Sequence, residues 1–399
     1  MVELVDDVQR QFDVGNILFS ICSDLEITKT QQERAETSYH AVGKWLADGQ
    51  HPYLKDAEIY PQGSIRLKTT VKPIGNDEFD VDLVCHLPHV PASIPAMEVY
   101  RIVGERLAEK ETYKKILKSK NRCWKLNYSG NFHLDITPAI TDEEEHHTDS
   151  IEVPDKEKSC WKDSNPKGYA DWFGEYAKFK PKLSIKTVRL IEAKAQIEEL
   201  PDVSEPTKDW LRKIVQICKR QRDVYYLELP EERKKRAPIS IIITTLAAKA
   251  YKVVCLSNKE FNSFQDVFEA VIKEMPKHIH IKKVNGEPEF TIPNETTKDE
   301  NFAEKWNQDN ERALEFNRWQ QSLLKSLQNI DKEMPVYQLK ESLDSIFGDT
   351  PVKRYFDADI KNVNQSRNSN TLKISAAVGV GASSGNAVPK NQFYMDGKG

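Results

Sequence analysis

Asp80 and Asp82 alternate with apolar residues in the segment FDVDLV, residues 79–84, a pattern typical of a β-strand. Alternate side chains of a strand lie on one face, so we expect the two carboxylates to lie close together. Like charges at such close range are unfavourable unless a cation lies between them. Carboxylate oxygens are ligands that Mg²⁺ prefers. The spacing therefore predicts a Mg²⁺ site on this strand.

A third aspartate, Asp135, has the same setting in the segment FHLDIT, residues 132–137. Its apolar neighbours alternate with it, so we expect the carboxylate to leave the core on the opposite face of the strand. Three acids from two strands are enough to hold two Mg²⁺ ions, one activating an attacking hydroxyl and one binding a nucleoside triphosphate. Asp80, Asp82 and Asp135 thus predict a centre for nucleotidyl transfer.

Gly63-Ser64 lies upstream of these acids, and Asp80 follows Ser64 by 16 residues. A glycine lets backbone N–H groups approach a phosphate closely, and the serine adds a hydroxyl donor. The dipeptide alone carries no information, because it is common in linkers. Its position before the two aspartates makes it a candidate phosphate-binding turn.

The elements that must position these residues differ between the two halves of the chain. The first half contains one or two helices within residues 6–46 and a helix from Ala92 to Lys110. Short alternating segments separated by turn sequences predict a mixed or antiparallel sheet. These segments are Ile65 to Val71, Phe79 to Cys85, Trp124 to Tyr128 and Phe132 to Ile136.

The second half is predicted to be helical. Apolar residues recur at helical spacing in Thr207 to Tyr226, in a segment that Ser263 can cap, and in Asn301 to Ile330. The last 35 residues, Gln365 to Gly399, contain glycine, serine and asparagine but few large apolar side chains, which is typical of a flexible tail.

The composition excludes several classes of protein. The 399 residues include 58 Lys and Arg against 62 Asp and Glu, a net charge of −4, so coating nucleic acid is not expected. With 39% hydrophobic residues the chain can build cores, yet its apolar runs are too short for a membrane span. The acidic N-terminus is unlike an export signal, and the six scattered cysteines form no metal-binding knuckle. We therefore expect a cytoplasmic protein with reduced thiols.

The motifs resemble a known superfamily. Residues 62–64 (QGS) and 80–82 (DVD), together with Asp135, are similar to the active-site pattern of the DNA polymerase β-like nucleotidyltransferases. Four later segments resemble the bacterial cGAS/DncV-like (CD-NTase) family, the cyclic oligonucleotide synthases of anti-phage signalling. They are residues 164–173, 215–223, 238–248 and 301–306. The resemblance extends over about residues 55–330.

The resemblance implies an α+β fold, in which a polymerase β-like sheet domain joins a helical domain in the bilobal architecture of OAS and cGAS. It divides the chain into N-terminal helices packing across both lobes (1–50), a catalytic core (51–160), a helical nucleotide-binding lid domain (161–350) and a flexible C-terminal tail (351–399).

The resemblance also implies a role for individual residues. The resemblance implies that Asp80, Asp82 and Asp135 are catalytic and bind two Mg²⁺ ions, which Mn²⁺ can replace. Asp135 would also accept the proton of the attacking hydroxyl. Substrate binding falls to Gln62, Gly63, Ser64, Lys219 and Ser240. Lys219 and Ser240 would bind the β- and γ-phosphates.

The implied activity is condensation of NTPs, ATP with GTP or pyrimidine NTPs as further candidates, into a cyclic di- or trinucleotide with release of pyrophosphate. No DNA requirement is expected, because the chain has neither a zinc ribbon nor a long basic helix. The tail ending in Gly399 is similar to tails that a ubiquitin-transfer-like partner conjugates. Two alternatives stay open: a nucleotidyltransferase that modifies RNA or protein, and a catalytically silent nucleotide-binding module. The bases, ring size and linkage are also open.

Overall fold

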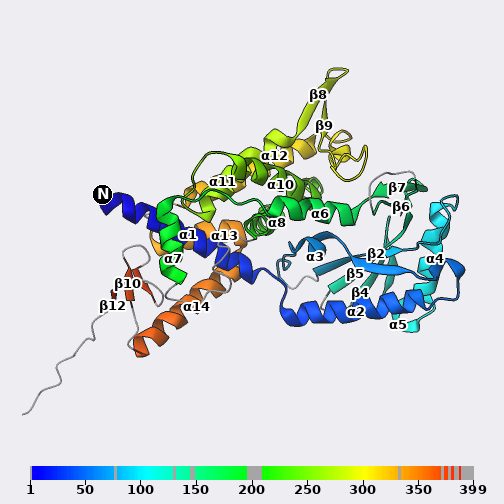
Figure 1. Ribbon diagram of the computed structural model, residues 1–399, viewed down its shortest axis with the longest axis horizontal. Coiled ribbons are helices and arrows are strands. Elements are labelled where there is room, and N and C mark those ends of the chain that lie inside the picture. Colours follow the sequence, from blue (N-terminus) through cyan, green and yellow to red (C-terminus); the bar gives the residue numbers. More distant parts are fainter. Residues whose placement is uncertain are drawn as a thin grey trace, which may run out of the picture.

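The chain folds into two lobes, a sheet lobe and a helical lobe, each with its own hydrophobic core (Figure 1). The computed structural model describes residues 2–75, 79–128, 132–143, 149–195, 209–330 and 334–369, together with the short strands β10 (Lys373–Ser375), β11 (Gly379–Gly381) and β12 (Asn386–Ala387). The α+β architecture agrees with the predicted fold class.

The sheet lobe is built on a mixed sheet of seven strands in the order β1-β2-β5-β4-β3, with β6 and β7 continuing from the end of β5. The strands are β1 (Glu58–Pro61), β2 (Phe79–His86), β3 (Leu117–Ser119), β4 (Trp124–Tyr128), β5 (Phe132–Thr141), β6 (Ile151–Asp155) and β7 (Cys160–Ser164). β2 and β5 are parallel, and the other pairs are antiparallel. The two acidic strands are therefore direct neighbours.

The predicted strand from Ile65 to Val71 is wrong, because this segment begins with the helix α3 (Gly63–Leu67). Lys68 then takes a left-handed backbone conformation (φ 57°) and ends the helix. The alternation of apolar residues that suggested a strand is too short to distinguish the two structures.

Helices cover one face of this sheet (Figure 1). They are α2 (Lys29–Ala47), α4 (Ala96–Ala108) and the short α5 (Glu111–Lys114); the 3₁₀ turn η1 (Pro52–Leu54) lies between α2 and β1. The helix predicted from Ala92 begins four residues later, because Pro95 occupies its N-cap and residues before a proline disfavour helical geometry. Among its apolar residues, Val99, Val103 and Leu107 are fully buried.

The helical lobe contains most of the remaining elements. They are α1 (Val2–Asp24), α6 (Pro166–Ala177), α7 (Ile185–Ala195), α8 (Trp210–Leu227), α9 (Glu231–Lys234), α10 (Ser240–Leu256), α11 (Phe264–Glu274), α12 (Glu311–Asn329), α13 (Val336–Phe347) and α14 (Asp349–Asn368), with the 3₁₀ turns η2 (Met275–His278) and η3 (Glu304–Trp306) and the hairpin of β8 (His280–Val284) and β9 (Glu287–Thr291). The hairpin projects from the lobe (Figure 1).

Ser263 caps α11 as predicted, since its hydroxyl accepts a hydrogen bond from the backbone N–H of Asp266 (3.1 Å). The helix predicted from Asn301 instead begins at Glu311. The Asn301 side chain accepts bonds from the backbone N–H groups of Ile292 and Ala303, both at 2.9 Å, and so holds this segment in a loop.

The N-terminal helices divide between the lobes. α1 packs against α7, α8 and α11 of the helical lobe, whereas α2 packs on β1, β2 and α4 of the sheet lobe. Thr28 begins α2 with a capping box, in which its side chain and that of Gln31 each bond the other's backbone N–H. The junction between α1 and α2 thus links the two lobes.

The predicted flexible tail from residue 351 is wrong up to Asn368, because α14 continues through residues 349–368 and packs on α1 and α13. Val352 of this helix is fully buried. Gly399, the residue predicted to be conjugated, lies outside the described residues. Among the described helices, none combines the length and the apolar character that a membrane span requires.

Candidate active site

The three predicted acids lie side by side on the sheet. On β2, Asp80 and Asp82 lie on the face opposite to Val81 and Leu83, which are buried in the core. In the parallel pairing of β2 with β5, Asp82 is the direct partner of Asp135. Alternation on each strand and the register between them therefore place the three carboxylates on one face of the sheet.

The electrostatics of this cluster call for a cation. Burial raises the pKa of Asp82 to about 6, and the carboxylates of Asp135 and Asp80 add to the increase, against the opposing effect of Lys219 and Lys125. Burial also raises the pKa of Asp135. Oδ1 of Asp135 is buried and has no hydrogen-bond partner among the described residues. Oxygen donors in this state fit Mg²⁺, which would neutralise their repulsion.

Lys125 lies beside these acids, a residue that the sequence analysis did not select. It is the antiparallel partner of Asp135 on β4. Its Nζ donates a hydrogen bond to Oδ1 of Asp80 (3.0 Å) and lies 3.8 Å from Oδ1 of Asp135. In the described part of the chain, no group of three His, Cys, Asp or Glu side chains is arranged so that it could hold a metal ion. An ammonium group thus bridges two of the proposed metal ligands.

The turn before α3 is shaped by its contact with Asp82. The backbone N–H of Gln62 donates to the Asp82 carbonyl (2.8 Å). Gly63 has φ +59°, and a Cβ atom there would lie only 2.5 Å from Oδ2 of Asp82. Both the conformation and the close approach therefore require glycine at this position. Ser64 follows in α3, where its hydroxyl accepts a hydrogen bond from Thr70 Oγ1 (3.3 Å).

Lys219 reaches from α8 to the sheet lobe. It is buried, and its Nζ donates to the carbonyl oxygen (3.2 Å) and to Oγ1 (2.9 Å) of Thr69, whose own N–H bonds the Ser64 carbonyl. Burial lowers the pKa of Lys219 to about 7, and Arg222 lowers it further, against the opposing effect of Asp82. The amine of Lys219 can therefore take up a proton and become charged when an anion binds nearby.

Ser240 is the first residue of α10 and is exposed. Its hydroxyl accepts a hydrogen bond from Nη1 of Arg222 (3.0 Å), which lies one turn beyond Lys219 on α8. Arg222 therefore connects the environments of Lys219 and Ser240. The sequence did not predict this role for Arg222, because the role depends on the packing of α8 against α10.

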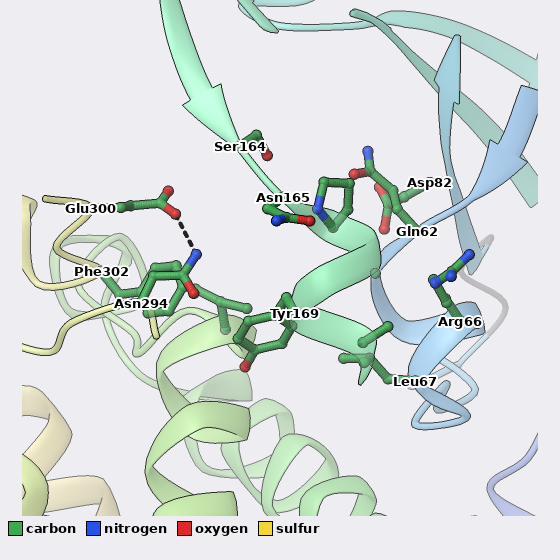
Figure 2. A pocket seen from close by; sticks show the side chains of 14 residues that line it. Gln62, Arg66, Leu67, Asp82, Ser164, Asn165, Tyr169, Asn294, Glu300 and Phe302 are labelled. Atoms are coloured by element: carbon green, nitrogen blue, oxygen red, sulfur yellow. Dashed lines mark hydrogen bonds between the residues drawn. The ribbon is translucent and has the colours of Figure 1, made fainter. Parts of the chain in front are cut away.

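A cavity of about 200 Å³ opens between the lobes beside Asp82 (Figure 2). Gln62, Gly63 and Arg66 line it from the sheet lobe. Tyr169, Asn294, Glu300 and Phe302 are among the residues that line it from the helical lobe. Of the predicted substrate-binding residues, Gln62 and Gly63 border this cavity, whereas Ser64, Lys219 and Ser240 do not.

The comparisons with known proteins identify the family. Residues 13–176 match the Second Messenger Oligonucleotide or Dinucleotide Synthetase domain. The chain is 32% identical over 374 residues to a c-di-GMP synthase of Roseivirga ehrenbergii, a match that covers 93% of this chain and 94% of the relative. The chain belongs to this CD-NTase family. It is therefore a nucleotidyltransferase of the cyclic oligonucleotide synthase type, as its motifs predicted.

Solved CD-NTase structures share the fold. The Bradyrhizobium diazoefficiens CdnG, in complex with GTP, has a TM-score of 0.63 at 18% identity and covers 87% of this chain and 99% of its own. The E. coli MS115-1 CdnC with ATP has a TM-score of 0.57 at 13% identity and covers 84% of this chain and 97% of its own. The bilobal α+β architecture predicted from the motifs is thereby confirmed. The roles of individual residues stay predictions.

Proposed function

We propose that this CD-NTase condenses two nucleoside triphosphates into a cyclic dinucleotide and releases two pyrophosphates. The observation that supports the proposal is the pairing of Asp82 with Asp135 and its shared strand face with Asp80, where Asp82 itself lines the cavity between the lobes. In each transfer, a ribose hydroxyl of one nucleotide attacks the α-phosphorus of the other. A phosphodiester bond forms, the bond to pyrophosphate breaks, and Asp135 accepts the hydroxyl proton.

Asp80, Asp82 and Asp135 would hold two Mg²⁺ ions, for which Mn²⁺ can substitute. Bound there, the ions would lower the pKa of the attacking hydroxyl and neutralise charge on the triphosphate. The glycine turn at Gly63 leaves room for the Asp82 carboxylate beside it. We assign Lys219 to the phosphates, together with Gln62, Ser64 and Ser240, because its ammonium lies at the boundary between the lobes.

We propose GTP as the preferred substrate and cyclic di-GMP as the product. Support comes from the relative at 32% identity, which is named a c-di-GMP synthase and aligns along nearly the whole chain. A ring of two nucleotides is accordingly expected before a ring of three. Because both transfers use NTPs, we place the enzyme in the cytoplasm.

The decisive experiment incubates the purified full chain with each NTP alone and with all four, in Mg²⁺ or Mn²⁺. Phosphatase-resistant products are then identified by mass spectrometry. We expect cyclic di-GMP from GTP, and no product from the double variant Asp80→Ala with Asp82→Ala. Asp171→Ala, which removes an exposed aspartate of α6, serves as the matched control and should retain activity.

Other products would reject the proposal. Only linear, phosphatase-sensitive oligomers would exclude cyclisation. Radiolabel transferred to RNA or protein would instead identify a macromolecule-modifying transferase, and tight NTP binding without pyrophosphate release would identify a silent binding module.

We also propose that the product signals phage infection, as the family resemblance implies. The expected result is a rise in cyclic dinucleotide in host cells after phage addition, measured by mass spectrometry of cell extracts. A strain with Asp82→Ala should show no rise. A partner that conjugates the C-terminus would add a mass to Gly399 in the same cells, which intact-protein mass spectrometry detects.

A further inference from the structure

The cavity between the lobes has two chemically different ends (Figure 2). Gln62 and Asp82 lie at the end where the proposed transfer takes place. Asn294, Glu300 and Phe302 lie at the opposite end, on the loop that connects β9 to η3. The second end therefore offers a carboxylate and an aromatic ring at a distance from the reacting phosphates.

The Glu300 carboxylate is held in place by its own loop. Nδ2 of Asn294 donates to Oε2 of Glu300 (2.7 Å) and also to Oγ1 of Thr297 (3.1 Å). The backbone N–H of Asn294 donates to the Glu300 carbonyl (2.9 Å). Oδ1 of Asn294 is occupied as well, because it accepts from the backbone N–H (3.0 Å) and the hydroxyl (2.9 Å) of Thr296. Asn294 is thus a positioning residue for this carboxylate.

Glu300 keeps acceptor capacity for a ligand. Among the described residues, the Asn294 amide is the donor that reaches this carboxylate, and no Lys, Arg or His forms an ion pair with it. An ionised carboxylate has about four acceptor sites on its two oxygens. Oε1 is therefore available, and Oε2 can accept a second bond.

Apolar walls flank the same end of the cavity. Tyr169 and Phe302 meet edge to face, with ring centroids 6.0 Å apart and planes at 86°. The Tyr169 hydroxyl is bonded to Thr245 Oγ1 (2.7 Å), which leaves the ring as the surface that faces the cavity. Ile241 lines the cavity directly after Ser240, a predicted phosphate ligand. The walls therefore suit a planar base whose phosphates extend toward the start of α10.

We infer that Glu300 selects guanine at this end of the cavity. Guanine presents two adjacent donors on its Watson–Crick edge, N1–H and the N2 amino group, and a carboxylate accepts from both. Adenine presents an acceptor at N1, which a carboxylate repels. The inference rests on the proposed function, because it takes the cavity to be the site of a bound NTP, and it identifies the residue that chooses the base.

Equilibrium binding tests this inference without turnover. The α,β-methylene analogues of GTP and ATP cannot release pyrophosphate, so calorimetry gives their dissociation constants for the full chain. We expect the wild type to prefer the GTP analogue by at least about tenfold, the range of one bidentate base contact. Glu300→Gln should remove this preference and improve binding of the ATP analogue, since an amide can donate to adenine N1 and accept from its amino group.

Two further variants complete the design. Glu300→Ala should lose the preference for guanine without gaining affinity for adenine. Glu289→Gln, the same chemical change at an exposed position of the hairpin strand β9, is the matched control and should behave as the wild type. Unchanged unfolding midpoints confirm that Glu300→Gln folds, as expected because its amide oxygen still accepts from Asn294.

Binding and product formation separate the two proposals. If the wild type makes cyclic nucleotides but Glu300→Gln keeps the wild-type ratio of the two dissociation constants within about twofold, the assignment of Glu300 is overturned and the proposed function stands. If no cyclic product forms but the ratio shifts as expected, the reaction is rejected and the assignment of Glu300 is supported.

Discussion

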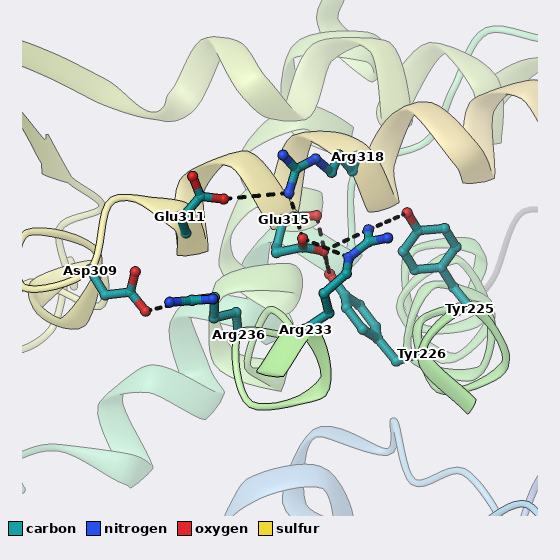
Figure 3. A network of polar contacts seen from close by, with 8 residues as sticks. All are labelled: Tyr225, Tyr226, Arg233, Arg236, Asp309, Glu311, Glu315 and Arg318. Carbon is teal, nitrogen blue, oxygen red and sulfur yellow. Dashed lines mark hydrogen bonds and ion pairs between the residues drawn. The ribbon is translucent and has the colours of Figure 1, made fainter. Parts of the chain in front are cut away.

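Each lobe contains a carboxylate that is largely shielded from water, but the surrounding groups shift the pKa values of the two carboxylates in opposite directions. Glu315 of α12 is 1% exposed and is surrounded by donors (Figure 3). Arg233 donates to both of its oxygens (2.8 and 3.0 Å), Arg318 donates to Oε1 (2.6 Å) and the Tyr226 hydroxyl to Oε2 (3.2 Å). Burial alone would raise the pKa of Glu315, but these bonds hold it below its usual value.

Asp82 has the opposite balance. Its partner across the strands is another acid, Asp135, and burial with two neighbouring carboxylates raises its pKa to about 6. The comparison indicates that the fold surrounds Glu315, a structural carboxylate, with cations, whereas Asp82, a proposed metal ligand, lies beside other acids. Removing each negative charge should therefore have opposite consequences for stability and activity.

The largest effect is expected for Asp82→Asn. Loss of a proposed metal ligand should reduce the rate of pyrophosphate release by at least about 10³-fold. The folded state should not lose stability in the absence of metal. A carboxyl with a raised pKa stabilises the fold below pH about 4, and this contribution is lost as the pH rises through 6.

At pH 7.5 without metal, Asp82→Asn should therefore raise the free energy of unfolding by on the order of 2 kcal/mol. Urea denaturation with and without Mg²⁺ measures this. A destabilised variant that keeps its activity would show that Asp82, like Glu315, supports the fold rather than a metal.

Glu315→Gln should show the reverse pattern. It replaces the buried anion that Arg233 and Arg318, both partly exposed, bind together, which should lower the free energy of unfolding by about 2 kcal/mol. Turnover per folded molecule should change little, because Glu315 lies outside the residues that line the cavity. Glu311→Gln is the control, since the exposed Glu311 contacts the same Arg318 at 3.5 Å. Equal stability of the two variants would contradict a structural role for the network.

The acidic centre could be predicted because local patterns determine it. Asp80 and Asp82 show their common face through the alternation of β2, and Asp135 repeats the pattern on β5. The parallel pairing that makes Asp82 and Asp135 neighbours is non-local, yet both apolar alternations require the acids to face away from the same core.

The rest of the site depends on register and loops that no local pattern encodes. Lys125 becomes part of the centre only through the pairing of β4 with β5. Glu300 lies in a segment next to a predicted helix, where the bonds of Asn301 and Asn294 to backbone and side-chain groups favour a loop. Lys219 was predicted only as a substrate-binding residue, and its burial against Thr69 depends on a contact between the lobes.

The pH dependence of NTP binding tests the role of Lys219, a buried amine. Its pKa is lowered to about 7 by burial and Arg222, with Asp82 and Asp223 opposing. The proposed contact with a triphosphate requires the charged form of Lys219, so NTP affinity should rise about fivefold as the pH falls from 8 to 7. In the free protein the same charging is unfavourable, because a lysine with a depressed pKa loses its stabilising contribution as the pH falls through 7.

Calorimetry in two buffers of different ionisation enthalpy should detect proton uptake when NTP binds. Lys219→Arg stays charged throughout this range and so reports the titration of the nucleotide itself. The same pH dependence in both proteins would mean that Lys219 does not change its charge on binding.

Lys125 sharpens the contrast between the two centres, and its substitution is expected to have the smallest effect. In the metal-free protein its ammonium bridges Asp80 and Asp135, so a metal ion must displace it. Lys125→Met keeps the length of the side chain but removes the charge. Mn²⁺ should then bind about threefold more tightly without nucleotide, because an ion pair with an acid as exposed as Asp80 contributes roughly 0.2–1 kcal/mol.

Titration followed by electron paramagnetic resonance measures this affinity for Mn²⁺, with Lys114→Met on α5 as the control. Weaker Mn²⁺ binding in Lys125→Met would mean that Lys125 stabilises its carboxylates as Arg233 stabilises Glu315. The number of cations around an acid would then not distinguish the proposed metal ligands of this protein from its structural carboxylates.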